Sequence, residues 1–89
     1  MKLIHQHNVK TTFFVRYYGM WIEIPSEYQY GWMKTDSNGY VYVYKHNPWR
    51  YRGVDNKSAV VCTVDLEGED PENTYQPIEM LNQSLHKGN

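Results

Sequence analysis

The chain of 89 residues contains one cysteine, Cys62, so no disulfide can form within it. Short secreted domains usually depend on disulfides, which makes a reducing compartment the better fit for this sequence. Residues 1–7 lack the apolar run of a signal peptide, and no stretch approaches the roughly 18 apolar residues that span a bilayer. We therefore expect a soluble, cytoplasmic protein that makes no membrane contact.

The chain also has no large excess of charge of one sign, because its nine Lys and Arg residues nearly balance its ten Asp and Glu residues. This balance leaves too few cations for a strong electrostatic footprint on nucleic acid and too few anions for a wholesale DNA mimic. The charges are unevenly distributed: residues 1–56 carry seven basic and four acidic side chains, whereas residues 57–89 carry two and six. Such an asymmetry can orient a partner without deciding whether that partner is acidic or basic.

Aliphatic bulk is scarce, and aromatic rings replace it. Nine Tyr, three Trp and two Phe residues make the chain 16% aromatic, while the mean hydropathy is only -0.77 because Tyr carries a polar hydroxyl. Tyr and Trp give interfaces a large contact area at low entropy cost. A thin β-domain, however, also needs rings to fill its core and cover its faces. The composition alone leaves both interpretations open.

A first hairpin is expected around Gly19. Residues 10–18 are rich in β-branched and aromatic side chains, Gly19 interrupts them, and residues 20–24 resume the strand pattern. The second arm alternates with a period of two, which is typical of a half-buried strand. The side chains that share its apolar face are Met20, Ile22 and Ile24.

Residues 32–44 carry the clearest local signal, a second hairpin around the turn 36–39. Asp36 in the first turn position and Gly39 in the fourth fit a type I turn closed by a left-handed glycine in a bulge. The alternative is a two-residue turn at Asn38 and Gly39, which would scatter polar residues over both faces. We expect the bulged turn because it segregates polar from apolar side chains.

The bulged register gathers aromatic rings on one face of this hairpin. It opposes Lys34 to Tyr42, so that the ammonium group lies over a ring, where cation–π attraction adds about 0.5–1 kcal/mol. The members of this face are Trp32, Lys34, Tyr40, Tyr42 and Tyr44. The loop 46–57 follows and interleaves cations with rings at Trp49, Arg50, Tyr51 and Arg52. Single-stranded nucleic acid is bound by such combinations, since bases stack on rings at about 1–3 kcal/mol each, and protein interfaces use the same residue types.

The second half of the chain predicts one apolar strand, a connector and a helix. Residues 58–66 are the most apolar segment, which we expect in the centre of the sheet. Residues 65–76 are an acidic connector interrupted by glycine and proline. Residues 77–87 have Pro at the first position and Lys at the last, so they predict a short C-terminal helix.

These segments predict one small domain over residues 1–89, mainly β with an α+β arrangement. We expect a small antiparallel sheet of about five strands, with barrel-like closure as an alternative and the helix 77–87 docked on the sheet. Residues 1–9 are expected to be a flexible N-terminal segment.

No motif of specific chemistry is present in the sequence. A catalytic nucleophile needs a base within hydrogen-bond reach, and no elbow or Cys/His signature indicates such a pair. Cys62 lies in the most apolar strand, which favours a buried, inert thiol. His5 and His7 would share one face of a strand, yet two ligands fall short of the four of a closed zinc site. The carboxylates of residues 65–72 fit no calcium loop. We expect no enzymatic activity, no metal site and no cofactor.

A resemblance adds to this picture, and it covers about a third of the chain within residues 20–49. The segments that carry it are 21–25 (WIEIP), 32–36 (WMKTD), 38–42 (NGYVY) and 47–49 (NPW). They resemble short accessory proteins encoded by tailed bacteriophages, which often show an Ile-Pro … Trp … Thr-Asp-x-Asn-Gly-x-Val-Tyr hairpin. The resemblance implies a phage origin and a protein that binds and blocks a host complex, as inhibitors of host defence such as anti-CRISPR proteins do. It implies no role for an individual residue.

We therefore expect a non-enzymatic binding protein that blocks a host protein or nucleoprotein complex in the host cytoplasm. The alternatives are a single-stranded nucleic-acid-binding module and a structural or assembly component, for example a homodimer that pairs edge strands. Monomer and homodimer both remain open. The residues expected to form the binding surface are Trp32, Lys34, Tyr40, Tyr42, Tyr44, Trp49, Arg50, Tyr51 and Arg52.

Overall fold

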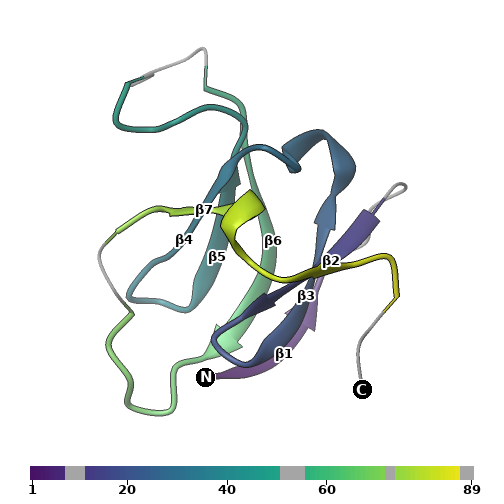
Figure 1. Cartoon of the computed structure of the whole chain (residues 1–89). Coiled ribbons are helices and arrows are strands. Elements are labelled where there is room, and N and C mark those ends of the chain that lie inside the picture. Colours follow the sequence, from purple (N-terminus) through teal and green to yellow (C-terminus); the bar gives the residue numbers. More distant parts are fainter. Residues whose placement is uncertain (8–11, 51–55, 72–73, 87–89) are drawn as a thin grey trace.

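The computed structural model of the chain describes residues 1–7, 12–50, 56–71 and 74–86. Within them the backbone forms eight β-strands and two short 3₁₀-helical turns, arranged as two antiparallel sheets (Figure 1). The expectation of a small, mainly β, antiparallel fold is confirmed. The strands divide into two sheets and do not close into a barrel, so the barrel-like alternative is wrong.

The two sheets hold five and three strands. In spatial order, the five-stranded sheet consists of Lys2–Gln6 (β1), Ser58–Asp65 (β6), Tyr40–Tyr44 (β5), Trp32–Thr35 (β4) and Gln76–Pro77 (β7). The three-stranded sheet consists of Met20–Pro25 (β3), Thr12–Tyr17 (β2) and Gln83–Ser84 (β8). The 3₁₀-helical turns are Ser26–Tyr28 (η1) and Ile78–Met80 (η2).

The predicted first hairpin is present as β2 and β3. Tyr18 and Gly19 connect the strands with φ values of 48° and 75°, and two successive positive φ angles define the turn whose twist matches that of a hairpin. Tyr17 pairs with Met20 at the turn. In β3, Ile22 and Ile24 are buried and Met20 is partly buried, as the alternation predicted.

The second hairpin, β4 and β5, has the predicted bulged register. Lys34 pairs with Tyr42, and Gly39 has a φ of +86°. The Asp36 carboxylate accepts the backbone N–H of Tyr40 at 3.0 Å, which holds the turn closed. The turn chemistry of the sequence therefore decides which side chains of β4 and β5 share a face.

Strand β6 was expected in the centre of the sheet; it is internal, between β1 and β5, but β5 occupies the central position. Its pairing with β5 shifts by one residue, because Val41 pairs with Cys62 whereas Tyr42 pairs with Val60. Val61 is the extra residue of this β-bulge. Val61 and Cys62 are consecutive and both buried, which a regular alternation would not allow.

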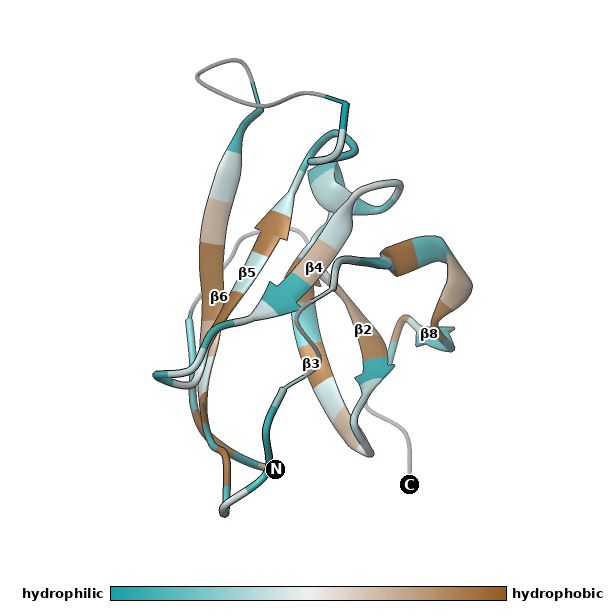
Figure 2. Ribbon diagram, turned by 90° about the vertical axis from the view of Figure 1, so that its left-hand side faces the viewer, coloured by the Kyte–Doolittle hydropathy of each residue, from teal (hydrophilic) through white to brown (hydrophobic). Residues whose placement is uncertain are grey.

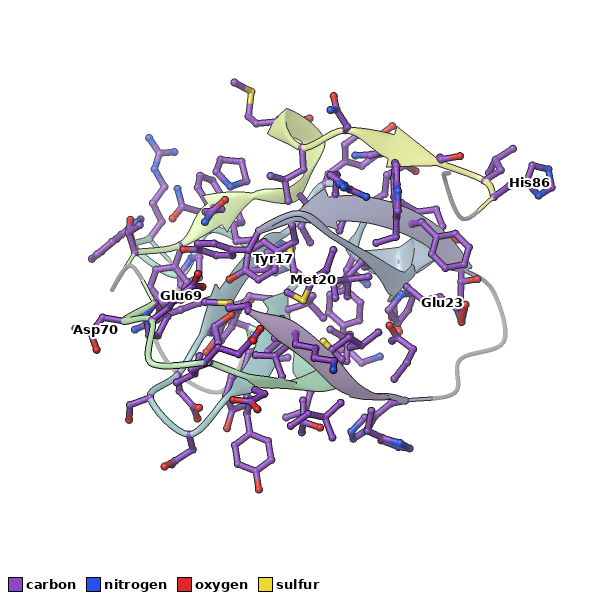
Figure 3. The ribbon with its side chains drawn as sticks, turned by 90° about the horizontal axis from the view of Figure 1, so that it is seen from below. Tyr17, Met20, Glu23, Glu69, Asp70 and His86 are labelled. Atoms are coloured by element: carbon purple, nitrogen blue, oxygen red, sulfur yellow. The ribbon has the colours of Figure 1, made fainter. Side chains whose placement is uncertain are left out.

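The hydrophobic core lies between the two sheets. Figure 2 shows hydrophobic residues concentrated on β2, β3, β5 and β6, and Figure 3 shows Tyr17 between the two layers. The Tyr17 hydroxyl and the Thr35 hydroxyl form a buried hydrogen bond of 2.6 Å that joins the sheets. The other side chains buried in this cluster are Phe13, Val15, Ile22, Ile24, Tyr28, Met33, Val41, Val43, Val61, Cys62, Val64 and Ile78.

The expected C-terminal helix over residues 77–87 is wrong. Residues 74–86 form β7, η2 and β8 and contain no α-helix. Pro77 pairs with Trp32 in the sheet, and the backbone N–H of Arg16 donates to the carbonyl of Asn82 at 2.9 Å. Leu85, within the expected helix, is 78% exposed. An isolated helix of this length is marginal in water, so pairing with two open sheet edges satisfies this backbone better.

The expectation of a flexible N-terminal segment is corrected for residues 2–6, which form β1 beside β6. Residues 8 and 9 lie outside the described residues. The side-chain amide of Gln6 joins β1 to the other sheet: its Oε1 accepts the N–H of Glu23 at 2.9 Å and its Nε2 donates to the Glu23 carbonyl at 3.0 Å. The same Nε2 lies 2.7 Å from the carbonyl oxygen of Val61. The side chain of Gln6 thus joins β1 to β3 by two hydrogen bonds.

The acidic connector between β6 and β7 is described at residues 66–71 and 74–75. The amino group of Met1 donates to Glu69 Oε2 at 2.8 Å and lies 3.8 Å from Glu67 Oε1. The hydrogen bond to Glu69 raises the pKa of this amino group.

No helix in the described part of the chain is long and apolar enough to cross a membrane.

Candidate binding surface

The outer face of the five-stranded sheet carries the predicted aromatic side chains. In β5, Val41 and Val43 are buried against the second sheet, whereas Tyr40, Tyr42 and Tyr44 lie on the opposite side. In β4, Met33 and Thr35 are buried and alternate with Trp32 and Lys34. Five of the nine residues that were expected to bind therefore lie together on the β4–β5 hairpin.

Four rings on this face contact one another in a continuous row. Tyr42 and Tyr44 have ring centroids 6.4 Å apart with an interplanar angle of 29°. Tyr75 contacts Tyr44 edge to face, with ring centroids 5.3 Å apart. Trp49 in turn contacts Tyr75, with centroids 5.3 Å apart and perpendicular ring planes. We call Tyr42, Tyr44, Tyr75 and Trp49 the aromatic cluster. Edge-to-face and offset stacked pairs are the arrangements that aromatic rings prefer.

Lys34 makes a cation–π contact with the cluster. Such a contact was expected, but with a ring of the hairpin face, and the ring found belongs to another segment. The Nζ of Lys34 lies 5.0 Å from the centroid of Tyr75. The long side chain thus covers a ring from the connector and not one from its own hairpin. This contact ties β4 to the residue that precedes β7.

Trp49 is held in place by a turn in the loop after β5. The side chain of Asn47 accepts the backbone N–H of Trp49 at 2.9 Å, and its carbonyl accepts the N–H of Arg50 at 3.0 Å. Pro48 is buried at the second position of this turn, where its fixed φ is favourable. The indole itself is 55% exposed. Local turn chemistry therefore presents Trp49 to solvent and to Tyr75 at once.

The base of the same loop is closed by paired hydrogen bonds. The side-chain amide of Asn56 accepts the N–H of His46 at 2.9 Å and donates to the His46 carbonyl at 3.0 Å. The N–H of Lys45 donates to the Lys57 carbonyl at 2.9 Å. The loop thus leaves and re-enters the sheet at neighbouring points, which keeps Trp49 above the outer face.

The remaining expected residues have different positions. Arg50 is exposed beside Trp49, and Tyr40 is 43% exposed at the start of β5. Trp32 is half-buried and pairs with Tyr44 across the hairpin. The other two expected residues, Tyr51 and Arg52, lie outside the described residues.

Sequence reasoning missed Tyr75. This residue lies in the polar connector, where no periodic pattern marks a position as facing the sheet. It reaches the cluster because β7 begins at the next residue and runs beside β4, with Gln76 paired to Met33 (Figure 1). The only available signal was a large ring within an otherwise polar and acidic segment.

The electrostatics of this surface are mixed. Burial raises the pKa of the Tyr44 phenol, and the neighbouring Tyr75 adds to the rise, so the hydroxyl stays neutral and can donate. Beside Lys34 lies a depression of about 430 Å³ whose lining also includes Asp36 and Asp70. Cations and carboxylates therefore flank the rings together.

The described residues contain no group of three or more His, Cys, Asp or Glu side chains placed to hold a metal ion. The thiol of Cys62 is buried in β6, and burial raises its pKa to about 12. A thiol in this state is a small hydrophobic side chain and not a nucleophile.

Comparison of the chain with protein-family models, with curated proteins and with solved structures found no match.

Proposed function

We propose that this chain is a non-enzymatic binding protein that docks the aromatic cluster on the surface of a partner protein. The observation that carries the proposal is the row of four rings on the outer face of the sheet, each in contact with the next, with Trp49 55% exposed. Tyr and Trp dominate the energetics of protein interfaces because each offers a large area with few rotatable bonds.

The aromatic side chains of the cluster are already restrained before a partner binds, which supports this function. Each ring of the cluster contacts at least one other ring, and the turn at Asn47 holds the backbone of Trp49. Side chains that are already restrained lose less entropy when a partner covers them. The cluster is also separate from the core, which is filled by other side chains on the inner face.

The charges beside the cluster support a protein partner over a polyanion. Lys34 and Arg50 are accompanied by Asp36 and Asp70, whereas a surface that tracks phosphates is lined by cations. The resemblance to phage accessory proteins extends the proposal: the partner would be a host protein or nucleoprotein complex, blocked by occupation of its surface.

Affinity capture with matched variants tests this function. The tagged protein is incubated with a nuclease-treated bacterial lysate, and retained proteins are compared for wild type, Trp49→Ala and Tyr30→Ala. Tyr30 is the control because it is 74% exposed in the turn after η1 and is not part of the cluster. We expect a partner that wild type and Tyr30→Ala retain and Trp49→Ala loses. Equal retention by all three proteins would show that the cluster is not the binding surface.

Single-stranded nucleic acid is a second candidate partner, favoured by one observation. Tyr42 and Tyr44 present two rings on alternate positions of one strand, with centroids 6.4 Å apart and planes inclined by 29°. Sheet-based RNA-binding modules stack successive bases on rings carried by their strands. Titration with an oligothymidine, followed by Trp fluorescence at several salt concentrations, tests it. Binding that weakens steeply with salt would support this candidate, and the absence of binding at low salt would remove it.

A further inference from the structure

Strand β1 places two histidines on the outer face of the five-stranded sheet. His5 pairs with Thr63 of β6, and the backbone N–H of His7 donates to the Val61 carbonyl at 2.9 Å, which continues the ladder one residue past the strand. Residues two apart on an extended chain project to the same side. The two imidazole rings accordingly lie side by side, with centroids 5.1 Å apart and an interplanar angle of 61°.

This ring separation is compatible with two imidazoles that share one metal ion. A zinc ion lies about 2.0–2.1 Å from a ligating imidazole nitrogen, and hence about 3.2 Å from the ring centroid. Two such rings at a tetrahedral angle have centroids about 5.2 Å apart. The observed 5.1 Å agrees with this value.

The rings are also accessible to solvent. His5 is exposed and His7 is partly exposed. Within the described part of the chain, neither imidazole has a hydrogen bond or an ion pair to another side chain or to the backbone. Their nitrogens can therefore accept a metal ion without the loss of an existing interaction.

We propose that His5 and His7 form a two-ligand site for a divalent transition-metal ion that prefers imidazole, with Zn²⁺ as the representative. The described residues supply no third ligand, so the remaining coordination positions are open to solvent. Such a site binds more weakly than a closed structural zinc site and does not hold the fold together. The inference rests on β1 alone and stands or falls independently of the aromatic cluster.

Zinc titration followed by NMR of the imidazole C–H signals tests the site. We expect ZnCl₂ at pH 7.5 to shift the signals of His5 and His7 together and saturably, while those of His46 and His86 stay in place. The variants His5→Gln and His7→Gln should each lower the zinc affinity at least tenfold, because a chelate needs both rings. His86→Gln is the matched control and should bind as the wild type does.

Two further arms keep the proposal falsifiable. CaCl₂ should cause no shift, because calcium prefers oxygen ligands. The melting temperatures of the metal-free variants should equal that of the wild type, which separates lost ligation from lost folding. Unchanged zinc affinity in either His5→Gln or His7→Gln, or equal shifts at all four histidines, would overturn the chelate.

Discussion

The inner and outer faces of the five-stranded sheet are built from the same strands, yet different forces order their side chains. Inside, Met33, Val41 and Val43 are fully buried against the second sheet. Outside, Tyr42 and Tyr44 contact each other, and Tyr75 of the connector contacts both Tyr44 and Trp49 of the loop. We therefore expect the inner face to set the stability of the fold and the outer face to tolerate substitution with little effect on folding. This separation is what a binding surface on a small domain needs.

The largest difference between the faces is expected in thiol reactivity on β6. Burial raises the pKa of Cys62 from 9.0 to about 12, so its thiolate fraction near pH 8 is about a thousandfold below that of a free thiol. We expect the native protein to resist an aromatic disulfide reagent and to react once unfolded in urea. Because the unfolded chain loses this proton at lower pH, ionisation of Cys62 also favours unfolding as the pH rises from about 9 toward 12.

The control for this experiment moves the thiol by one residue to the outer side of β6. The double variant Cys62→Val, Thr63→Cys keeps the inner volume filled and places the thiol opposite Tyr40. It should react quickly in the folded state. Rapid reaction of the wild type would show that Cys62 is not enclosed between the sheets.

The next largest effect is expected from a cavity on the inner face. Met33→Ala should lower the free energy of unfolding by about 2–5 kcal/mol, because Met33 is fully buried and its removal leaves a void. Urea denaturation followed by far-UV circular dichroism measures the change. A loss below about 1 kcal/mol would contradict the assignment of this face to the core.

Two glycine substitutions sharpen the comparison at the turns. Gly39 and Gly19 both have positive φ, so alanine should cost each about 1–2 kcal/mol of unfolding free energy. At Gly39 a methyl group would also clash with the carbonyl oxygen of Val64, whereas nothing lies near it at Gly19. We expect Gly39→Ala to be the more destabilising by at least about 1 kcal/mol in the same urea assay. Equal losses would mean that the turn 36–39 does not pack against β6.

The smallest effect on stability is expected on the outer face. Tyr75→Ala removes ring contacts with Tyr44 and Trp49 and the support of Lys34, but leaves the core intact. The unfolding free energy should fall by no more than about 1 kcal/mol, while near-UV circular dichroism should weaken because the remaining rings lose order. A loss as large as that of Met33→Ala would show that the cluster is part of the core.

Much of the fold was predictable because its hairpins are specified locally. Asp36 and Gly39 set the register of β4 and β5, and Gly19 marks the first hairpin, since turn chemistry acts over a few residues. The bulge at Val61 was not predictable, because it depends on how β6 fits both β5 and the second sheet. Strand β1 was missed for a similar reason: its polar sequence becomes a strand only where β6 offers a free edge.

The candidate surface divides in the same way. The sequence by itself determined that Tyr42, Tyr44 and Lys34 share a face, because a strand alternates with a period of two and the turn fixes its phase. The sequence also predicted Trp49 on this surface, but only the tertiary structure decided that Tyr75 joins them and contacts Trp49, since these contacts link segments far apart in the sequence through β7 and a closed loop. The tertiary structure also decided against the helix expected at residues 77–87. The backbone there pairs with β2 and β4, and this pairing stabilises it more than the local helix propensity of a short segment would.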